Sequence, residues 1–326
     1  MAARHARTRR PSTARTAAPA PCRGGAPALT RPGTRSRAAR PPAPTLLGIV
    51  TCREDFEALR RDGGTEYTGY AEYLADIEEL LGRLREAGGV VRGRAFHPGD
   101  LVDFCRSRGL SLADPESHTD YTADPDAEDE WVLYEGEPTA EFTARLARAR
   151  ERGLVHRRLA RMLAETAEAA ATGGEFPEHL LHTAYTQGAD ALRRVLVGAG
   201  QGRFRLVCSL RSPEGPVEAW ADLLLEEEAD GGGTVLRIEE ADLDLLCSLL
   251  CTGFALGLPG GVVLSGMCRT RGSVAWGWEL DDGGFVPRNA ADVLLDLSVP
   301  AVSWIAVCLP GAESVPGFAL GGISLG

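Results

Sequence analysis

The chain contains no lysine, so all 35 of its basic side chains are arginine. With abundant alanine, glycine and leucine, this usage is typical of a GC-rich bacterial genome. Acidic residues are absent from residues 1–44, which hold ten arginines and almost no large apolar side chain. Such a segment cannot bury enough surface to offset the entropy of ordering it, so we predict a disordered tail. The tail is either an arm for nucleic acid or a partner, or an extension without a role.

The rest of the chain has little positive charge for its acid content. Beyond residue 44, 25 arginines stand against 46 acidic residues, a formal charge of −21. A surface this acidic repels nucleic-acid phosphates and anionic lipid, because the electrostatic attraction that drives such binding needs the opposite sign. We therefore expect this acidic part neither to bind nucleic acid nor to attach to a membrane.

Long apolar runs and C-x-x-C pairs are also absent. The longest apolar stretch, Ala301–Leu309, lies between two prolines and is far too short to span a bilayer. No apolar run follows Arg9-Arg10, so this pair does not predict an export signal. The eight cysteines are scattered, mostly among apolar neighbours. We expect a cytoplasmic protein with reduced core thiols, no metal and no cofactor.

The first half of the sequence predicts an α/β region over residues 45–172. Leu46–Val50 and Val90–Phe96 are short apolar runs typical of buried strands, and each precedes a helical pattern. A strand–helix–strand–helix order implies a right-handed parallel crossover and hence a short parallel sheet. Residues 112–130 are predicted to form a polar loop.

Three further elements close this region. Trp131–Tyr134 could be a third strand, and Thr139 to about Ala171 has a helical pattern that could break near Gly153. Gly173-Gly174 and Pro177 mark the predicted boundary to a second region.

Residues 173–326 predict an α+β region with antiparallel strands. A helix over residues 178–197 is followed by short strand patterns, by the apolar helix Leu243–Leu256, and by a short helix that Asn289 caps. The predicted strands are residues 204–210, 217–225, 234–239, 262–270 and 274–280.

The candidate site comes from topology. Ligands of open parallel sheets bind beyond the carboxyl ends of the strands. The first strand ends near Arg53 and the second near His97 and Asp100, so neighbouring strands would bring these residues together beside two helix N-termini, which attract anions. Arg53 would supply charge, and His97 could titrate near neutrality. This predicts a small anionic ligand. Alternatively, Asp100 only stabilises its own helix and His97 is a surface residue.

Other motifs fail on context. Gly198-Ala199-Gly200-Gln201-Gly202 follows a helix and precedes a strand, the reverse of a dinucleotide fingerprint. His179 and His182 lack the spacing of a zinc helix, and Cys247 and Cys251 lie on an apolar helix as core residues would. No serine has the G-x-S-x-G context of a hydrolase nucleophile.

An arginine-rich stretch within the acidic region has two interpretations. It could bind an anion or nucleic acid, or it could pair internally with the acidic residues just before it. We favour internal pairing. The arginines are Arg145, Arg148, Arg150, Arg152, Arg157, Arg158 and Arg161, and the acids are Asp124, Asp126, Glu128, Asp129, Glu130, Glu135, Glu137 and Glu141.

No assembled set of catalytic groups is visible in the sequence. We therefore expect a non-enzymatic binding or regulatory protein whose partner is another protein or a small anionic ligand. The alternative is an enzyme that acts on a small anionic metabolite at Arg53, His97 and Asp100. A deep polar pocket there would favour the enzyme, and an exposed apolar patch elsewhere would favour a protein partner.

Overall fold

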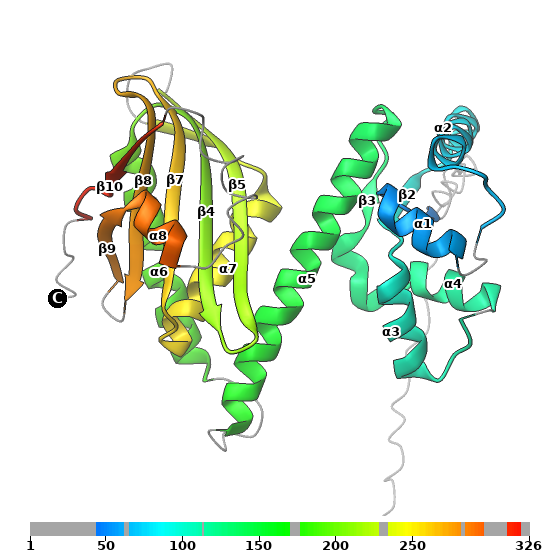
Figure 1. The fold of residues 1–326 in the computed structure, drawn as a ribbon, viewed down its shortest axis with the longest axis horizontal. Coiled ribbons are helices and arrows are strands. Elements are labelled where there is room, and N and C mark those ends of the chain that lie inside the picture. Colours follow the sequence, from blue (N-terminus) through cyan, green and yellow to red (C-terminus); the bar gives the residue numbers. More distant parts are fainter. Residues whose placement is uncertain are drawn as a thin grey trace, which may run out of the picture. The chain divides into compact units, whose positions relative to one another are not determined.

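A computed structural model describes residues 44–61, 65–112, 114–169, 177–227, 234–281, 284–296 and 312–320. The predicted tail, apart from Pro44, and the Ala301–Leu309 stretch lie outside these residues. The described part confirms the predicted fold class: a short three-stranded sheet with its helices is followed by a seven-stranded, mainly antiparallel sheet (Figure 1). The predicted division at residues 172 and 173 stays a prediction.

The first sheet contains the predicted parallel pair. Its order is β1-β2-β3, with β1 (Thr45–Ile49) parallel to β2 (Val91–Ala95) and β3 (Val132–Leu133) antiparallel to β2. Helices α1 (Arg53–Arg61) and α2 (Tyr70–Glu86) connect the parallel strands. Gly93 of β2 leaves room for the Phe142 side chain, since a Cβ at Gly93 would lie 2.7 Å from the Phe142 ring.

The predicted polar loop over residues 112–130 is wrong. After α3 (Pro98–Arg108), the chain forms helix α4 (Pro115–Thr122) and a 3-10 helix, η1 (Pro125–Glu130). Asp114 caps α4, with its side chain accepting a hydrogen bond from the Glu116 amide at 3.0 Å. Tyr121 anchors α4 in an aromatic cluster with Phe96 and Phe104. The Asp114 cap and the buried Tyr121 ring therefore stabilise a helix that the polar composition of this segment does not predict.

Helix α5 (Thr139–Ala169) is continuous through Gly153, so the predicted break is wrong. The glycine provides space instead, because a Cβ at Gly153 would lie 2.5 Å from Glu130 Oε1. Phe142 packs into the core of the first sheet, while Leu159, nearly five turns further on, packs into the core of the second. One helix thus contributes to both cores.

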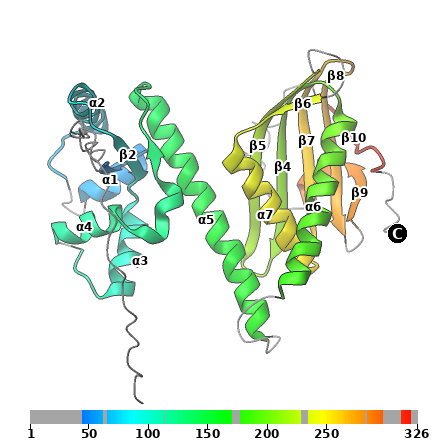
Figure 2. The same ribbon diagram turned by 180° about the vertical axis from the view of Figure 1, so that it is seen from behind.

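The second sheet has the order β10-β9-β8-β7-β4-β5-β6. Alternate residues of its strands form the largest core with α6 (Glu178–Ala199) and α7 (Glu240–Leu256), which cover one face together with part of α5 (Figure 2). The strands are β4 (Gly202–Ser212), β5 (Gly215–Glu227), β6 (Thr234–Arg237), β7 (Gly260–Cys268), β8 (Gly272–Asp281), β9 (Gly284–Asn289) and β10 (Glu313–Pro316).

The described residues cover the opposite face of this sheet only in part. Helix α8 (Ala290–Asp296) packs there through Ala290 and Val293, over Val207, Val263 and Ala275. Its N-terminus has the predicted cap, since Asn289 Oδ1 accepts a hydrogen bond from the Ala291 amide at 3.0 Å. We call the part of this face beyond α8, on strands β7, β4, β5 and β6, the open face.

Two arginines of α5 reach the outer edge of β5. Strand β6 pairs with residues 224–227 of β5, and no other strand of the described ranges pairs with that edge. Arg148 donates a hydrogen bond to the Trp220 carbonyl, and Arg158 donates to the carbonyls of Gly215 and Pro216 at 2.8 and 2.9 Å.

Among the helices of the described ranges, none has the length and apolar character needed to cross a membrane.

Candidate functional site

The predicted site lies where β1 and β2 end, and the structure brings two of its three residues together. His97 caps α3, and its Nδ1 accepts a hydrogen bond from the Asp100 amide at 3.2 Å. His97 Nε2 lies 3.3 Å from Asp55 Oδ1 on α1. Arg53 is the exposed first residue of α1 and takes no part in these contacts.

An arginine from α5 completes this network. The Arg150 guanidinium binds Asp100 through two hydrogen bonds of 2.7 and 3.0 Å. Burial alone would raise the pKa of Asp100, but the hydrogen bonds and charge of Arg150 outweigh it and hold that pKa below its ordinary value. We call Asp55, His97, Asp100 and Arg150 the edge network.

The edge network leaves few groups free for chemistry. Both His97 nitrogens face protein groups: Nδ1 accepts the Asp100 amide and lies 3.1 Å from Asp100 Oδ1, and Nε2 lies 3.3 Å from Asp55 Oδ1. Asp100 occupies the fork of Arg150. The nearby Tyr121 hydroxyl is buried, and burial raises its pKa to about 12, so it stays protonated at neutral pH. The network therefore joins α1, α3 and α5 and offers no unoccupied cation to an anionic ligand.

Asp55 and Arg150 were not predicted from the sequence. Asp55 lies two residues beyond Arg53, so the same topological argument applies to it. Arg150 is 50 residues from Asp100, and no local pattern joins them.

The arginine-rich stretch is paired internally, as favoured, but mostly with other partners. Among the preceding acids whose side chains are described, Arg145 reaches Glu135 and Glu137, and Arg157 reaches Glu130. The other five turn elsewhere. Arg148 and Arg152 share Asp242 of α7, Arg150 binds Asp100, Arg158 binds backbone carbonyls and Ser212, and Arg161 lies 3.8 Å from Glu214.

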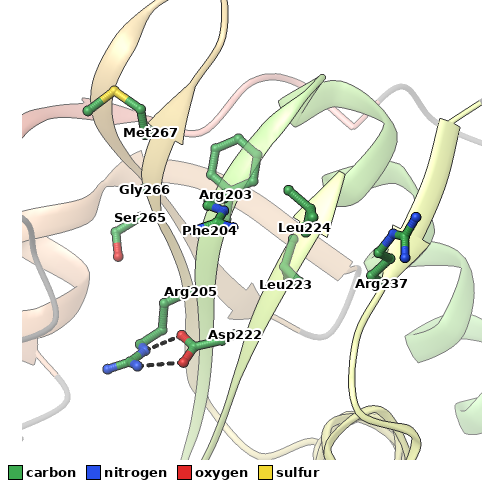
Figure 3. A pocket seen from close by; sticks show the side chains of 10 residues that line it. All are labelled: Arg203, Phe204, Arg205, Asp222, Leu223, Leu224, Arg237, Ser265, Gly266 and Met267. Atoms are coloured by element: carbon green, nitrogen blue, oxygen red, sulfur yellow. Dashed lines mark hydrogen bonds and ion pairs between the residues drawn. The ribbon is translucent and has the colours of Figure 1, made fainter. Parts of the chain in front are cut away.

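The open face carries a different arrangement. Strand pairing sets four side chains side by side in one row across β7, β4, β5 and β6: Met267, Arg203, Leu224 and Arg237. A second row, two residues along, contains Ser265, Arg205 and Asp222. Both rows line a groove of about 690 Å³ (Figure 3).

The charges of the groove are only partly neutralised. Arg205 forms two hydrogen bonds with Asp222 across the strands, at 2.6 and 2.7 Å (Figure 3). These bonds raise the pKa of Arg205. Arg237 bonds Glu226 at 2.7 Å. Arg203 is exposed and has no ion pair within the part of the chain that the structure describes.

Trp220 connects the groove to α5. Its ring lies under two guanidinium groups, with the Arg148 Cζ 3.6 Å and the Arg205 Cζ 4.6 Å from the ring centroid. Such contacts are attractive because the ring face is electron-rich. The ring thus holds Arg205 beside Asp222 at the border of the groove.

The sequence predicted these strands but not the open face. The alternation Arg203-Phe204-Arg205-Leu206 indicates that one face of β4 is polar. It does not indicate how far α8 extends over that face. Only the strand order places Met267 and Arg237 in line with Arg203.

The remaining motifs have structural positions. Gly198 lies in α6 and Gly202 begins β4, so the glycine-rich segment joins a helix to a strand, as predicted. His182 lines a second hollow, of about 480 Å³, between α5, α6 and α7. Among the described ranges, no three His, Cys, Asp or Glu side chains are grouped as a metal site requires.

Comparison with protein families gives one match. Residues 34–137 match the family described as Domain of unknown function (DUF8829), a range that contains β1, β2, β3 and three of the edge-network residues. The seven-stranded sheet lies outside the match. Comparison with curated proteins and with solved structures gave no match.

Proposed function

We propose that this chain is a non-enzymatic binding protein of the bacterial cytoplasm and that the open face is its binding surface. The observation that carries the proposal is Arg203, an exposed cation without an ion pair among the described residues, set between Met267 and Leu224. Met267 is 53% exposed. Apolar side chains beside arginine are typical of binding surfaces. The ligand would therefore combine apolar surface with negative charge.

The contrast with the edge network supports this choice. There, Arg150 is already bound by Asp100, so a ligand would have to displace a carboxylate. In the groove, Arg203 needs no such displacement, and the cationic side chains of the lining outnumber its one carboxylate, Asp222. An anionic group is therefore favoured at the groove over the edge network.

A pair of dyes tests the proposal. We expect the native chain to bind anilinonaphthalene sulfonate, an apolar anion, more tightly than the uncharged N-phenylnaphthylamine. Changing Arg203 and Arg237 to Gln should weaken only the binding of the anion, by about tenfold. Arg53→Gln, an exposed arginine elsewhere, serves as the control and should change neither. Equal loss in the control, or no fluorescence change with either dye, would overturn the proposal.

The alternative function, an enzyme at the edge network, rests on the contact of His97 with Asp55 and Asp100. It predicts that inorganic phosphate raises the melting temperature of the native chain and that His97→Ala abolishes this increase. The binding-protein proposal predicts that phosphate acts, if at all, through Arg203, and that His97→Ala leaves the effect unchanged.

A further inference from the structure

We infer that the open face binds an amphipathic helix of a partner protein. The side of the helix that faces the groove carries apolar and acidic residues in alternation. The inference rests on the proposed function and specifies its partner. It starts from the first row of the groove, in which apolar and cationic side chains alternate: Met267, Arg203, Leu224, Arg237. An occupant lying along this row must offer apolar and anionic groups in the same alternation.

The spacing of the row favours a helix. Neighbouring strands lie about 4.8 Å apart, so the four positions span about 14 Å. Helical residues three or four apart on one face are separated by about 4.5–6 Å along the axis, which matches one step of the row. In an extended peptide, side chains on the same side are about 6.6–6.8 Å apart, so they fall out of step with the strands within two positions.

The same spacing predicts a sequence pattern in the partner. In this pattern, an apolar residue of the partner lies over Met267, and an acidic residue three positions later lies over Arg203. An apolar residue then lies over Leu224, and an acidic residue lies over Arg237. The two acids are then seven residues apart, about 10.5 Å along the helix. Arg203 and Arg237 stand two strands apart, about 9.6 Å, so one acid can pair with Arg203 while the other competes with the exposed carboxylate of Glu226 for Arg237.

The second row restricts the helix to the first. Arg205 is already held by Asp222 through two hydrogen bonds, and Asp222 is 63% exposed at its side chain. An acid approaching this row meets a carboxylate that repels it and a cation held by two hydrogen bonds, whereas Arg237 of the first row is held by one, to Glu226, and its side chain is 70% exposed. Asp222 is therefore a specificity-determining residue. Its replacement by Asn should free Arg205 and strengthen binding of an acidic helix.

The test uses synthetic labelled peptides with the full-length chain, followed by fluorescence anisotropy. One peptide carries Leu and Glu in the predicted spacing on an alanine background. The second replaces each Glu by Lys, and the third has the first peptide's composition with a proline at its centre. We expect the Glu peptide to bind and the Lys and proline peptides to bind at least about tenfold more weakly.

Variants of the groove sharpen the test. Changing Arg203 and Arg237 to Glu should weaken the Glu peptide by at least about tenfold and should allow the Lys peptide to bind. The double change of Arg53 and Arg83 to Glu alters the net charge equally on the exposed surface of α1 and α2, and it should have no effect. Asp222→Asn should tighten the Glu peptide by about threefold to tenfold.

The outcomes separate this inference from the proposed function. If the apolar anion binds through Arg203 but the Glu peptide does not, the binding surface stands and the helical partner is wrong. If the Lys peptide binds as tightly as the Glu peptide, the inferred negative charge of the partner is wrong. If the proline peptide binds as tightly, the inferred helical conformation is wrong. Binding of the Glu peptide with the predicted charge reversal, and its strengthening by Asp222→Asn, supports the inference.

Discussion

The arginines of α5 and those of the open face carry the same charge in opposite surroundings. Arg148 and Arg152 are 14% and 13% exposed at their side chains and share the buried carboxylate of Asp242. Arg203 is exposed and unpaired among the described residues, and Arg237 is 70% exposed at its side chain. The helix uses its guanidinium groups to join elements of one chain, whereas the sheet leaves Arg203 accessible to another molecule and holds Arg237 only through an exposed pair with Glu226.

This difference shows that a basic stretch in a sequence is a poor guide to a binding surface. The most arginine-dense stretch beyond the tail is bound internally. The most exposed of the groove's cations, Arg203 and Arg237, come from two different strands, β4 and β6, and belong to no dense basic stretch. What decides availability is how completely the carboxylates and carbonyls of the same chain surround a guanidinium group and how far it is buried.

The strongest test of the internal arginines is Glu130→Ala. Glu130 is 1% exposed and pairs with Arg94, which is itself 5% exposed, and with Arg157. Removing the carboxylate leaves the Arg94 charge buried without its partner, so we expect a loss of about 3–5 kcal/mol in the free energy of unfolding. Urea denaturation measures it. Asp103→Ala, which breaks an exposed pair with Arg106, should cost no more than about 1 kcal/mol. Equal losses would show that burial does not matter here.

The comparison itself is tested by Arg148→Ala and Arg203→Ala. The first removes a hydrogen bond to the Trp220 carbonyl, an ion pair with Asp242 and the stacking on the Trp220 ring. We expect it to lower the free energy of unfolding by about 2 kcal/mol, since a charged hydrogen bond contributes about 1.5–3 kcal/mol. The second should change stability by less than about 0.5 kcal/mol. A larger loss from Arg203→Ala would mean that Arg203 is a structural residue and not a free cation.

Two glycine-to-alanine substitutions in helices should change the free energy of unfolding in opposite directions. Gly153→Ala places a Cβ within 2.5 Å of Glu130 Oε1, and displacing this buried carboxylate should cost about 1–3 kcal/mol. Gly82→Ala in α2 meets nothing within 4 Å, and alanine there should stabilise the helix by about 0.5–1 kcal/mol. Thermal and urea unfolding of both variants give the signs. Stabilisation by Gly153→Ala would contradict the close contact between α5 and η1.

The smallest expected effect is a pH dependence at the edge network. Arg150 lowers the pKa of Asp100, so the stability that this pair contributes is present above the unfolded value, about 3.9, and is lost as the pH falls through the lower folded value. Asp100→Asn should therefore cost about 1 kcal/mol near pH 6 and progressively less below about pH 4. Urea unfolding at several pH values measures this difference. A constant difference down to about pH 2 would show that Asp100 does not titrate with a lowered pKa.

Local patterns predicted most of the fold. The two-residue alternation of β4 and β5 and the apolar run of β2 are short-range signals. The predicted bounds of these three strands lie within three residues of the bounds in the structure. Helix α4 was missed because its stability comes from a cap at Asp114 and a distant aromatic cluster around Tyr121, which local hydrophobicity does not report. Gly153 was misinterpreted for the same reason, since the contact that requires a glycine lies on η1.

The site was predictable only in part. His97 and Asp100 follow from the ends of two neighbouring parallel strands, a topological rule that the sequence supports. The rule located the strand ends but could not show that Arg150 already occupies Asp100. The open face needs more: its first row joins residues of four strands, from Arg203 to Met267, and their alignment exists only once the strand order and register are known.

The guanidinium groups that α5 places along β5 also bear on how the protein behaves at high concentration. The uncovered edge of a sheet is a template onto which another chain can add a strand, and this is a common route to aggregation. Arg148 and Arg158 occupy the carbonyls of Trp220 and Pro216, which an incoming strand would need as acceptors. Their charges would also have to be displaced or buried in the process. We therefore expect the helix that contributes to both cores also to disfavour self-association along this edge.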